Sequence, residues 1–357
     1  MLSVLIIFLS FVQGATKTIT VSIDSGSIQG TINPTNTVAS YRGIPYAAPP
    51  VDSLRFQKPT HVQPWNTTLL TTVDGPGCPQ QCKLPPVACP PKTSEDCLFL
   101  NVFAPVTSTA DKLPVMFWLH GGDYYQGYGG GLLYDGSDLV ARENVIVVSI
   151  NYRIGALGFL YSGSDSKTQF TGNYGTLDQQ FALQWVQRNA HVFGGDPNQV
   201  TIFGQSAGSE SVAVLLNMPS NKGLFSKAIM QSFPSALPFR TADKAPSFTK
   251  VVAKDAGCDV TVPYEECMRT LTWQEILAAA VKAETNVLAN LNEFLSLFQP
   301  YSPTVGTLDL TKQPMEGFLD GSSIDVPIIM GSVRQEGVIF MYEAFHKGLE
   351  RTEEDVS

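Results

Sequence analysis

The chain has 357 residues, of which 43% are hydrophobic, enough to fill the core of one large domain or two small ones. Its formal net charge is -9, and its 23 lysines and arginines form no basic stripe. These properties exclude a disordered chain and make nucleic acid a poor candidate partner.

The chain begins with an apolar segment, residues 2–12, that is too short to cross a bilayer. Small residues that suit signal peptidase follow at Gly14 and Ala15. We therefore expect a signal peptide over residues 1–14 and a secreted or secretory-pathway protein. A buried N-terminal strand or a membrane anchor is the alternative, and no later segment is expected to span a membrane.

The next part of the sequence changes from a strand pattern to a loop pattern. Residues 18–32 alternate β-branched and polar residues around an Asp-Ser-Gly turn, which predicts an antiparallel hairpin at an edge. Residues 41–110 are rich in proline, glycine and threonine, which favours loops laid over a core.

Short apolar segments then recur, as is typical of strands buried on both faces of a parallel sheet. They comprise residues 115–119, 145–150, 200–203, 227–230 and 326–330. Helical patterns lie between them, such as the stripe formed by Leu177, Phe181 and Trp185. This alternation predicts a doubly wound, mostly parallel α/β fold.

Residues 273–299 form a further helical stretch between the last two strands, and we expect this stretch to lie over one end of the sheet. No internal repeat or linker interrupts the chain. We therefore expect one domain over residues 15–357.

Six cysteines behind a predicted leader indicate disulfides rather than a metal or redox site. Four of them share one proline-rich segment and two bracket a second: Cys78, Cys82, Cys89, Cys97, Cys258 and Cys267. Proximity suggests pairing within each segment, although other connectivities stay open. A zinc site is not expected, because no histidine lies near the CPQQC spacing. Asn66 begins an Asn-Thr-Thr sequon and is a predicted glycosylation site.

A candidate nucleophile lies where an apolar strand meets a helix. Residues 204–208 read GQSAG, with the strand VTIF before them and the helical sequence SESVAVLLNM after them. This context is that of a nucleophile elbow, in which a sharp turn exposes Ser206 at the helix N-terminus. The flanking glycines are needed because a Cβ would collide with the neighbouring strand or helix. An ordinary strand-to-helix turn is the alternative.

A second candidate part of the site is the glycine-rich segment that follows the strand at 115–119. His120, Gly121, Gly122 and Asp123 form a loop whose backbone N–H groups could approach a carbonyl oxygen. The N–H of Ala207 would complete an oxyanion hole. By itself, such a segment also fits a plain strand-to-loop turn.

A third part is a carboxylate. In the elbow-type hydrolases the triad follows the chain order serine, acid, histidine. Glu336 follows the last predicted strand and is the candidate acid; a solvated loop residue is the alternative. Asp320 and Asp325 precede that strand and lie at the wrong edge for this role.

Together these residues resemble the type-B carboxylesterase and cholinesterase family, which has the α/β-hydrolase fold. Residues 193–208 (FGGDPNQVTIFGQSAG) match its active-serine signature, and residues 95–102 (EDCLFLNV) match its second signature. Shorter matches occur at residues 41–47, 54–56, 151–153 and 172–175. The resemblance extends over residues 18 to about 340.

The resemblance implies several pairings and roles. The implied disulfides are Cys78 with Cys97, Cys258 with Cys267, and, from the two remaining cysteines, Cys82 with Cys89. The implied ion pairs are Arg42 with Glu95 and Arg153 with Asp178. Glu336 would be the triad acid, and Gly122, Asp123 and Ala207 would supply the oxyanion donors.

Three features depart from the family. Asp123 replaces the third glycine of the oxyanion loop, where its side chain restricts φ and adds negative charge. Val333 stands where the family usually has asparagine. The third feature concerns the triad histidine, which occurs much later in the family.

None of the four histidines fits the triad position. His61 and His191 precede Ser206, His120 belongs to the oxyanion loop, and His346 follows Glu336 too closely. The last strands of the family's sheet are also missing from the sequence. We therefore expect an incomplete carboxylesterase domain that, alone, is inactive or aggregates.

The expected function is hydrolysis of small carboxylic esters through an acyl-enzyme, without a metal or organic cofactor. Choline esters are not expected, because residues 78–97 contain no aromatic side chain that could hold a cation. The alternative is a non-catalytic adhesion or binding protein on the same scaffold. Ser206 and Glu336 argue against that alternative, whereas Asp123 and the absent histidine favour it.

Overall fold

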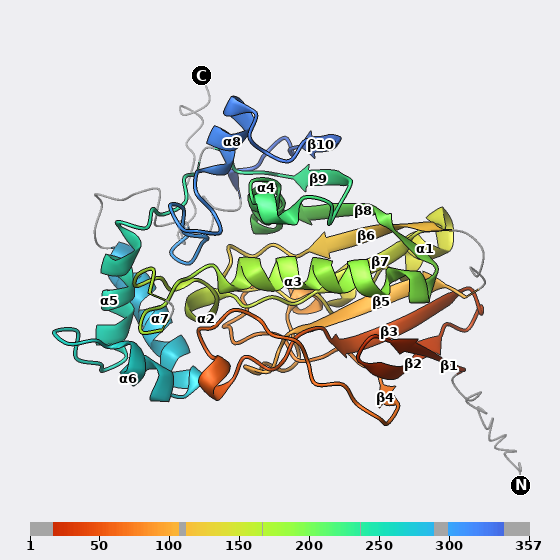
Figure 1. Ribbon diagram of the computed structural model, residues 1–357, viewed down its shortest axis with the longest axis horizontal. Helices are drawn as coiled ribbons and strands as arrows, with labels where there is room; N and C mark the ends of the chain where they lie inside the picture. The colour runs from red at the N-terminus through yellow and green to blue at the C-terminus, as the bar shows by residue number, and fades with distance from the viewer. Residues whose placement is uncertain (1–16, 107–111, 166, 236, 289–298, 339–357) are drawn as a thin grey trace, which may run out of the picture.

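The computed structural model describes residues 17–106, 112–165, 167–235, 237–288 and 299–338. The predicted signal peptide and His346 lie outside these residues. In the described part, a sheet of ten strands runs through the molecule, with helices packed along it (Figure 1).

The sheet has the order β1-β2-β3-β5-β7-β6-β8-β9-β10, and β4 pairs with β2. Its antiparallel part contains β1 (Thr18–Ile23), β2 (Gly26–Ile32), β3 (Val38–Pro45) and β5 (Phe99–Pro105). β4 (Leu69–Leu70) is parallel to β2. The other part is parallel: β6 (Leu113–Leu119), β7 (Ile146–Ile150), β8 (Gly195–Gln205), β9 (Lys227–Gln231) and β10 (Ile328–Gly331).

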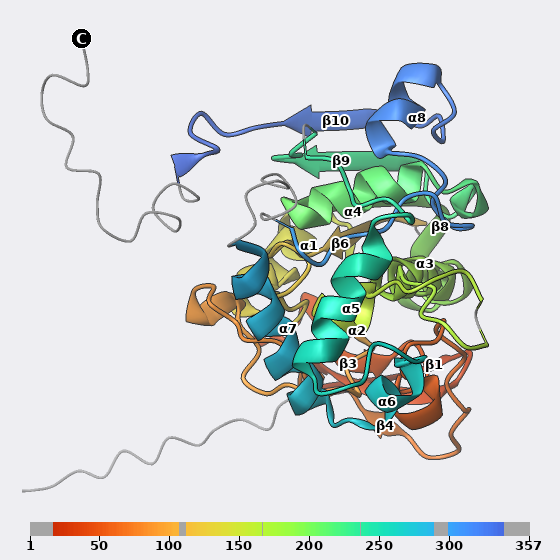
Figure 2. The ribbon, with the colours of Figure 1, turned by 90° about the vertical axis from the view of Figure 1, so that its left-hand side faces the viewer.

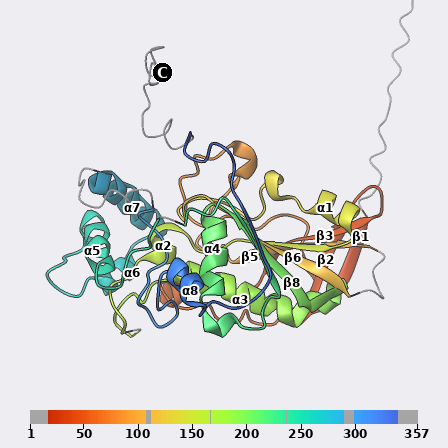
Figure 3. The ribbon, with the colours of Figure 1, turned by 90° about the horizontal axis from the view of Figure 1, so that it is seen from above.

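Helices cover both faces of the sheet. α1 (Ser137–Glu143) and α3 (Tyr174–Asn189) lie on opposite faces, as the view from above shows (Figure 3). α4 (Ala207–Leu216) packs on β8 and β9, and every one of its residues is buried. The remaining α-helices are α2 (Gly155–Phe159), α5 (Ala245–Asp255), α6 (Glu265–Thr270), α7 (Trp273–Leu288) and α8 (Pro314–Asp320). The predicted doubly wound α/β architecture is confirmed.

α7 lies in the helical stretch predicted over residues 273–299, and it gathers with α5 and α6 at one end of the sheet (Figure 1). α7 is described as far as Leu288, and the rest of the predicted helical stretch, residues 289–298, lies outside the described part; Gln299, its last residue, is not helical. None of the helices described is long and apolar enough to cross a bilayer.

The prediction of loops over residues 41–110 is wrong in three places. Most of β3 and all of β4 and β5 lie in this stretch, and β5 pairs with both β3 and β7. Because β5 is covered on both faces, five successive residues of it are buried, and the half-exposed alternation of an edge strand is absent. The prolines and glycines around it concealed this short strand.

At the other edge, β10 is the outermost strand and pairs only with β9 among the described elements (Figure 2). All of its residues are exposed, including Ile329 and Met330, which are 67% and 63% exposed. An apolar strand with one free edge is a surface on which another strand can pair.

Three disulfides close the two cysteine segments, and their pairs are those that the resemblance implies. They join Cys78 to Cys97, Cys82 to Cys89, and Cys258 to Cys267.

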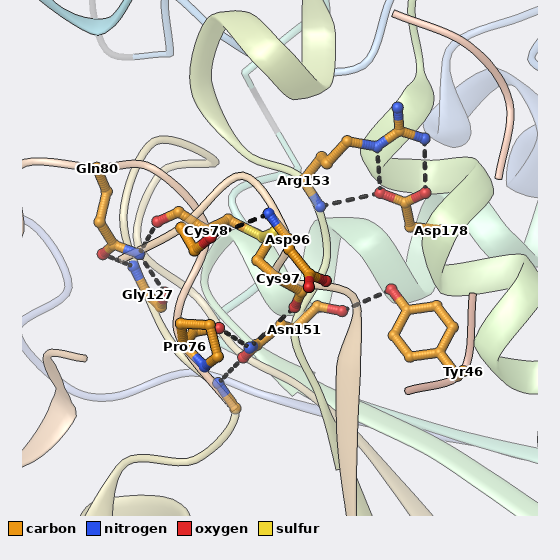
Figure 4. Close-up of a disulfide and its surroundings, with 12 residues drawn as sticks. Tyr46, Pro76, Cys78, Gln80, Asp96, Cys97, Gly127, Asn151, Arg153 and Asp178 are labelled. Carbon is orange, nitrogen blue, oxygen red and sulfur yellow. Dashed lines mark hydrogen bonds and ion pairs between the residues drawn. A yellow bond between two sulfur atoms is a disulfide. The ribbon is translucent and has the colours of Figure 1, made fainter. Parts of the chain in front are cut away.

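The predicted pair between Arg153 and Asp178 is present and buried (Figure 4). The guanidinium donates from Nε and Nη2 to the two carboxylate oxygens at 2.8 and 2.7 Å. The backbone N–H of Arg153 also donates to Asp178, at 3.0 Å. This pair joins the segment after β7 to α3.

The predicted pair between Arg42 and Glu95 is wrong. Arg42 instead forms an ion pair with Asp135 at 2.5 Å, and its guanidinium lies 4.9 Å from the centre of the Phe103 ring. Phe103 packs on the face of the sheet that α1 covers, so the side chain of Arg42 is directed to that face. Glu95 forms a buried ion pair with Arg55.

Candidate active site

Ser206 lies at a strained turn between β8 and α4. Its backbone dihedrals are φ 56° and ψ -126°, a combination that residues with a side chain rarely adopt. Its N–H donates to Gln231 O at 3.0 Å, and its carbonyl accepts from the N–H groups of Ser209 and Glu210. The surrounding strand and helix therefore hold this partly exposed serine in one orientation.

The two glycines of the elbow have no room for a side chain. A Cβ on Gly204 would lie 2.4 Å from the carbonyl oxygen of Gly208, within the helix. A Cβ on Gly208 would lie 2.1 Å from the carbonyl oxygen of Leu119, at the end of β6. Both contacts are collisions, as the sequence predicted.

The glycine-rich loop lies directly against Ser206. A Cβ on Gly121 would be 3.2 Å from the Cβ of Ser206 and 2.5 Å from Gln205 O. Gly122 has a φ of 110°, and its carbonyl accepts from two later N–H groups, so the loop turns tightly back. Asp123 has a φ of 52°, in the left-handed region that aspartate tolerates better than most residues.

The first disulfide segment supports this loop (Figure 4). The side chain of Gln80 exchanges two hydrogen bonds with the backbone of Gly127, each of 2.8 Å. The amide of Asn151 donates to the carbonyls of Pro76 and Cys97, at 2.9 and 3.1 Å. The loop around the Cys78–Cys97 bond and the oxyanion loop are therefore one connected structure.

His120 is a structural part of the loop. It is 1% exposed, its ring stacks on Tyr152 with 4.3 Å between ring centres, and its Nδ1 lies 2.9 Å from Gly121 O. The hydroxyl of Tyr152 donates to the carbonyl of His120 at 2.7 Å. Burial lowers the pKa of His120 to about 4, so the ring is neutral at neutral pH.

We expect acid to destabilise the fold through His120. An unfolded histidine has a pKa of about 6.5, and the folded value is about 4. The unfolded state takes up the proton first, so the free energy of unfolding should fall by about 3 kcal/mol as the pH drops through this window. Urea unfolding of wild type and His120→Gln between pH 4 and 7 checks this. The exposed His191→Gln is the control, and parallel pH curves for wild type and His120→Gln would contradict the expectation.

Glu336 lies in the turn that follows β10. It is exposed, and its Oε1 accepts the backbone N–H of Val333 at 2.7 Å. β9 separates β8 from β10, so Ser206 and Glu336 follow parallel strands at the same edge of the sheet. Two strand spacings correspond to about 10 Å, a separation that requires a group between the serine and the acid.

Sequence reasoning missed Glu210, which lies one helical turn after Ser206. Its side chain is buried, and its Oε2 accepts from Gln299 Nε2 at 2.6 Å. Burial, reinforced by the nearby charge of Asp123, raises its pKa well above the usual range. The sequence signal that could have identified Glu210 is that it is the one acidic residue in a helix whose other residues are small or apolar.

A cavity lies beside the oxyanion loop, between α2, α7 and the first disulfide segment. Its volume is about 500 Å³, including the solvent at its mouth. Tyr125, the second residue after Asp123, forms one wall. The other walls are mainly apolar and include Ile154, Leu157, Ile276, Leu277, Ala280 and Val281. Lys83 and Glu284 are the charged residues of the lining, and burial raises the pKa of Glu284 to about 7.

A model of the carboxylesterase family matches residues 17–357. The chain belongs to the carboxylesterase family. It is 39% identical to para-nitrobenzyl esterase of Bacillus subtilis (90% of this chain, 63% of that protein). It is also 39% identical to liver carboxylesterase 1F of Rattus norvegicus (85% and 55%) and 40% identical to the "Crystal protein" of Dictyostelium discoideum (91% and 57%).

Solved carboxylesterase structures have the same fold. A PNB esterase superposes with a TM-score of 0.80 at 38% identity, over 90% of this chain and 64% of that one. A carboxylesterase of Geobacillus stearothermophilus superposes with a TM-score of 0.79 at 34% identity, over 91% and 63%. The predicted family and α/β-hydrolase fold are confirmed. The chain spans between 55% and 63% of the length of the three curated relatives named above.

Proposed function

We propose that Ser206 is the nucleophile of a carboxylic ester hydrolase that works through an acyl-enzyme on small esters. The observation that carries this proposal is the strained serine at the N-terminus of α4, with Gly121 directly against it. Ser206 would attack the ester carbonyl, and the N–H groups of Gly122, Asp123 and Ala207 would stabilise the oxyanion. Water would then cleave the acyl-enzyme.

The proposed mechanism needs a general base between Ser206 and Glu336, with Glu336 orienting it. None of the three histidines in the described ranges suits this role, because His120 is buried under the loop and His61 and His191 lie on the surface. We propose that this base is a histidine that lies outside the described residues.

The cavity beside Tyr125 is the proposed place for the apolar part of the ester. Its mainly aliphatic lining suits an alkyl or aryl group and offers few aromatic faces to a quaternary cation. A general carboxylesterase is therefore favoured over a choline esterase.

A secreted or secretory-pathway location is also proposed. Three disulfides suit an oxidising compartment, and the sequon residue Asn66 is exposed, as glycosylation requires.

The test uses the protein encoded by the full gene. Incubation with a fluorophosphonate should label one serine, which peptide mass spectrometry should identify as Ser206, and p-nitrophenyl acetate should give a burst of nitrophenol. A folded, full-length protein that neither labels nor gives a burst would instead be a non-catalytic binding protein on this scaffold. The carboxylate at Asp123 is the observation that favours this second candidate.

We expect Asp123→Gly to raise ester turnover about tenfold. The aspartate brings negative charge to the oxyanion loop, and removing a charge that opposes the oxyanion stabilises the transition state by about 1 to 2 kcal/mol. Steady-state kinetics with p-nitrophenyl acetate measure the effect. Asp123→Asn removes the charge without giving the backbone the conformational freedom of glycine. Unchanged or slower turnover in both variants would contradict the role given to the charge.

A further inference from the structure

A buried carboxyl group lies behind the oxyanion loop. Glu210 is 1% exposed, and its Oε2 accepts the hydrogen bond from Gln299. Its other oxygen, Oε1, has no hydrogen-bond partner among the described residues. A carboxylate with an unsatisfied, buried oxygen is costly, so the state of this group needs an explanation.

The titratable groups around Glu210 come from the loop and from the segment after β7. Asp123 lies close enough for its charge to act on Glu210. The buried hydroxyl of Tyr124 interacts electrostatically with both carboxyl groups, and Tyr152 also interacts with Glu210. Tyr124 has a φ of 60°, so Asp123 and Tyr124 are two successive left-handed residues that require support.

We propose that Glu210 is a positioning residue of the active site, whose buried carboxyl group couples the nucleophile helix to the Asp123–Tyr124 loop. The proposal rests on the proposed function of Ser206. Gln299 holds one oxygen of this group, and the other oxygen is buried without a hydrogen-bond partner among the described residues. Glu210 acts through the loop and the helix and does not touch the substrate.

The protonation state of Glu210 decides how this residue affects the acylation of Ser206. Burial raises the pKa of this carboxyl group well above its usual range, and its un-ionised form has an O–H that can donate from the otherwise unpaired side. At higher pH the proton leaves to solvent and a second negative charge joins Asp123 near the developing oxyanion. Acylation of Ser206 should therefore slow as Glu210 ionises.

Stability tests the protonation state without any catalysis. The unfolded carboxyl has a pKa of about 4.3, and the folded one is raised, so the folded state holds the extra proton between these values. The unfolding equilibrium constant of wild type should rise with pH in this window, by up to about tenfold per pH unit relative to Glu210→Gln. The exposed Glu143→Gln should follow wild type. Identical pH curves for wild type and Glu210→Gln overturn the proposal.

Acylation tests the coupling to the loop. In the full-gene protein, fluorophosphonate labelling of Ser206 should slow at high pH in wild type, and Glu210→Gln should lack that decrease. Glu210→Gln and Asp123→Asn should be non-additive in labelling rate, by at least about threefold, because the two groups interact. Additive effects, or a high-pH decrease that persists in Glu210→Gln, overturn the proposal. Wild type that does not label at all overturns the function proposed for Ser206, and with it this role.

Discussion

Replacing Ser206 with alanine should abolish fluorophosphonate labelling of the full-gene protein and lower ester turnover by at least about 10⁴-fold. In the proposed mechanism the hydroxyl of this residue forms the acyl bond, and the turn that presents it stays intact because the backbone keeps its bonds to Gln231, Ser209 and Glu210. Stopped-flow assays with p-nitrophenyl acetate, together with gel readout of the label, measure both effects.

The matched control is Ser220→Ala, which removes an exposed serine in the turn that follows α4. It should label at the wild-type rate. Labelling that persists in a folded Ser206→Ala variant, or label found on another residue, would mean that the elbow is not the catalytic site. Equal thermal unfolding of the variants shows that the loss is chemical and not structural.

Asp178→Asn should destabilise the fold by about 3 to 5 kcal/mol, the usual effect of breaking a buried ion pair on one side. Asp178 is fully buried and accepts three hydrogen bonds from Arg153. Asparagine has nearly the same size, so it leaves the packing in place while the guanidinium of Arg153 stays buried without its counter-charge. Urea unfolding at neutral pH measures the difference.

An exposed ion pair supplies the comparison. Lys58 and Asp309 are 3.3 Å apart, and the lysine side chain is 56% exposed. Asp309→Asn should therefore cost less than about 1 kcal/mol. If the two substitutions destabilise the fold equally, burial does not set the strength of the Arg153–Asp178 pair.

Much of this fold follows from local sequence pattern. The apolar segments predicted the strands from β6 to β10. Burial on both faces explains the nearly continuous apolar pattern of β7, whereas β10 has an apolar pattern although all of its residues are exposed. β5 escaped prediction although it has the same character, because it lies within a stretch that proline and glycine dominate. Its burial depends on β3 and β7, which lie far from it in the sequence.

The features of the site likewise fall into those that local sequence predicted and those that it did not. The elbow was recognisable because the strand, the serine between glycines and the helix are consecutive. The proposed site also contains groups from distant parts of the sequence: the glycine-rich loop follows β6, and Gln299 reaches Glu210 across 89 positions of the sequence. The prediction for Arg42 failed because the side on which its side chain packs is decided by Phe103 and α1.

The sequence by itself determined the family, the candidate nucleophile and the succession of strands and helices, since each is written in neighbouring residues. Only the tertiary structure decided which arginine neutralises Glu95 and how the first disulfide segment supports the oxyanion loop. It also decided that a glutamate in the nucleophile helix is buried beside Asp123. These contacts join distant segments, and their energies depend on burial, which no local pattern specifies.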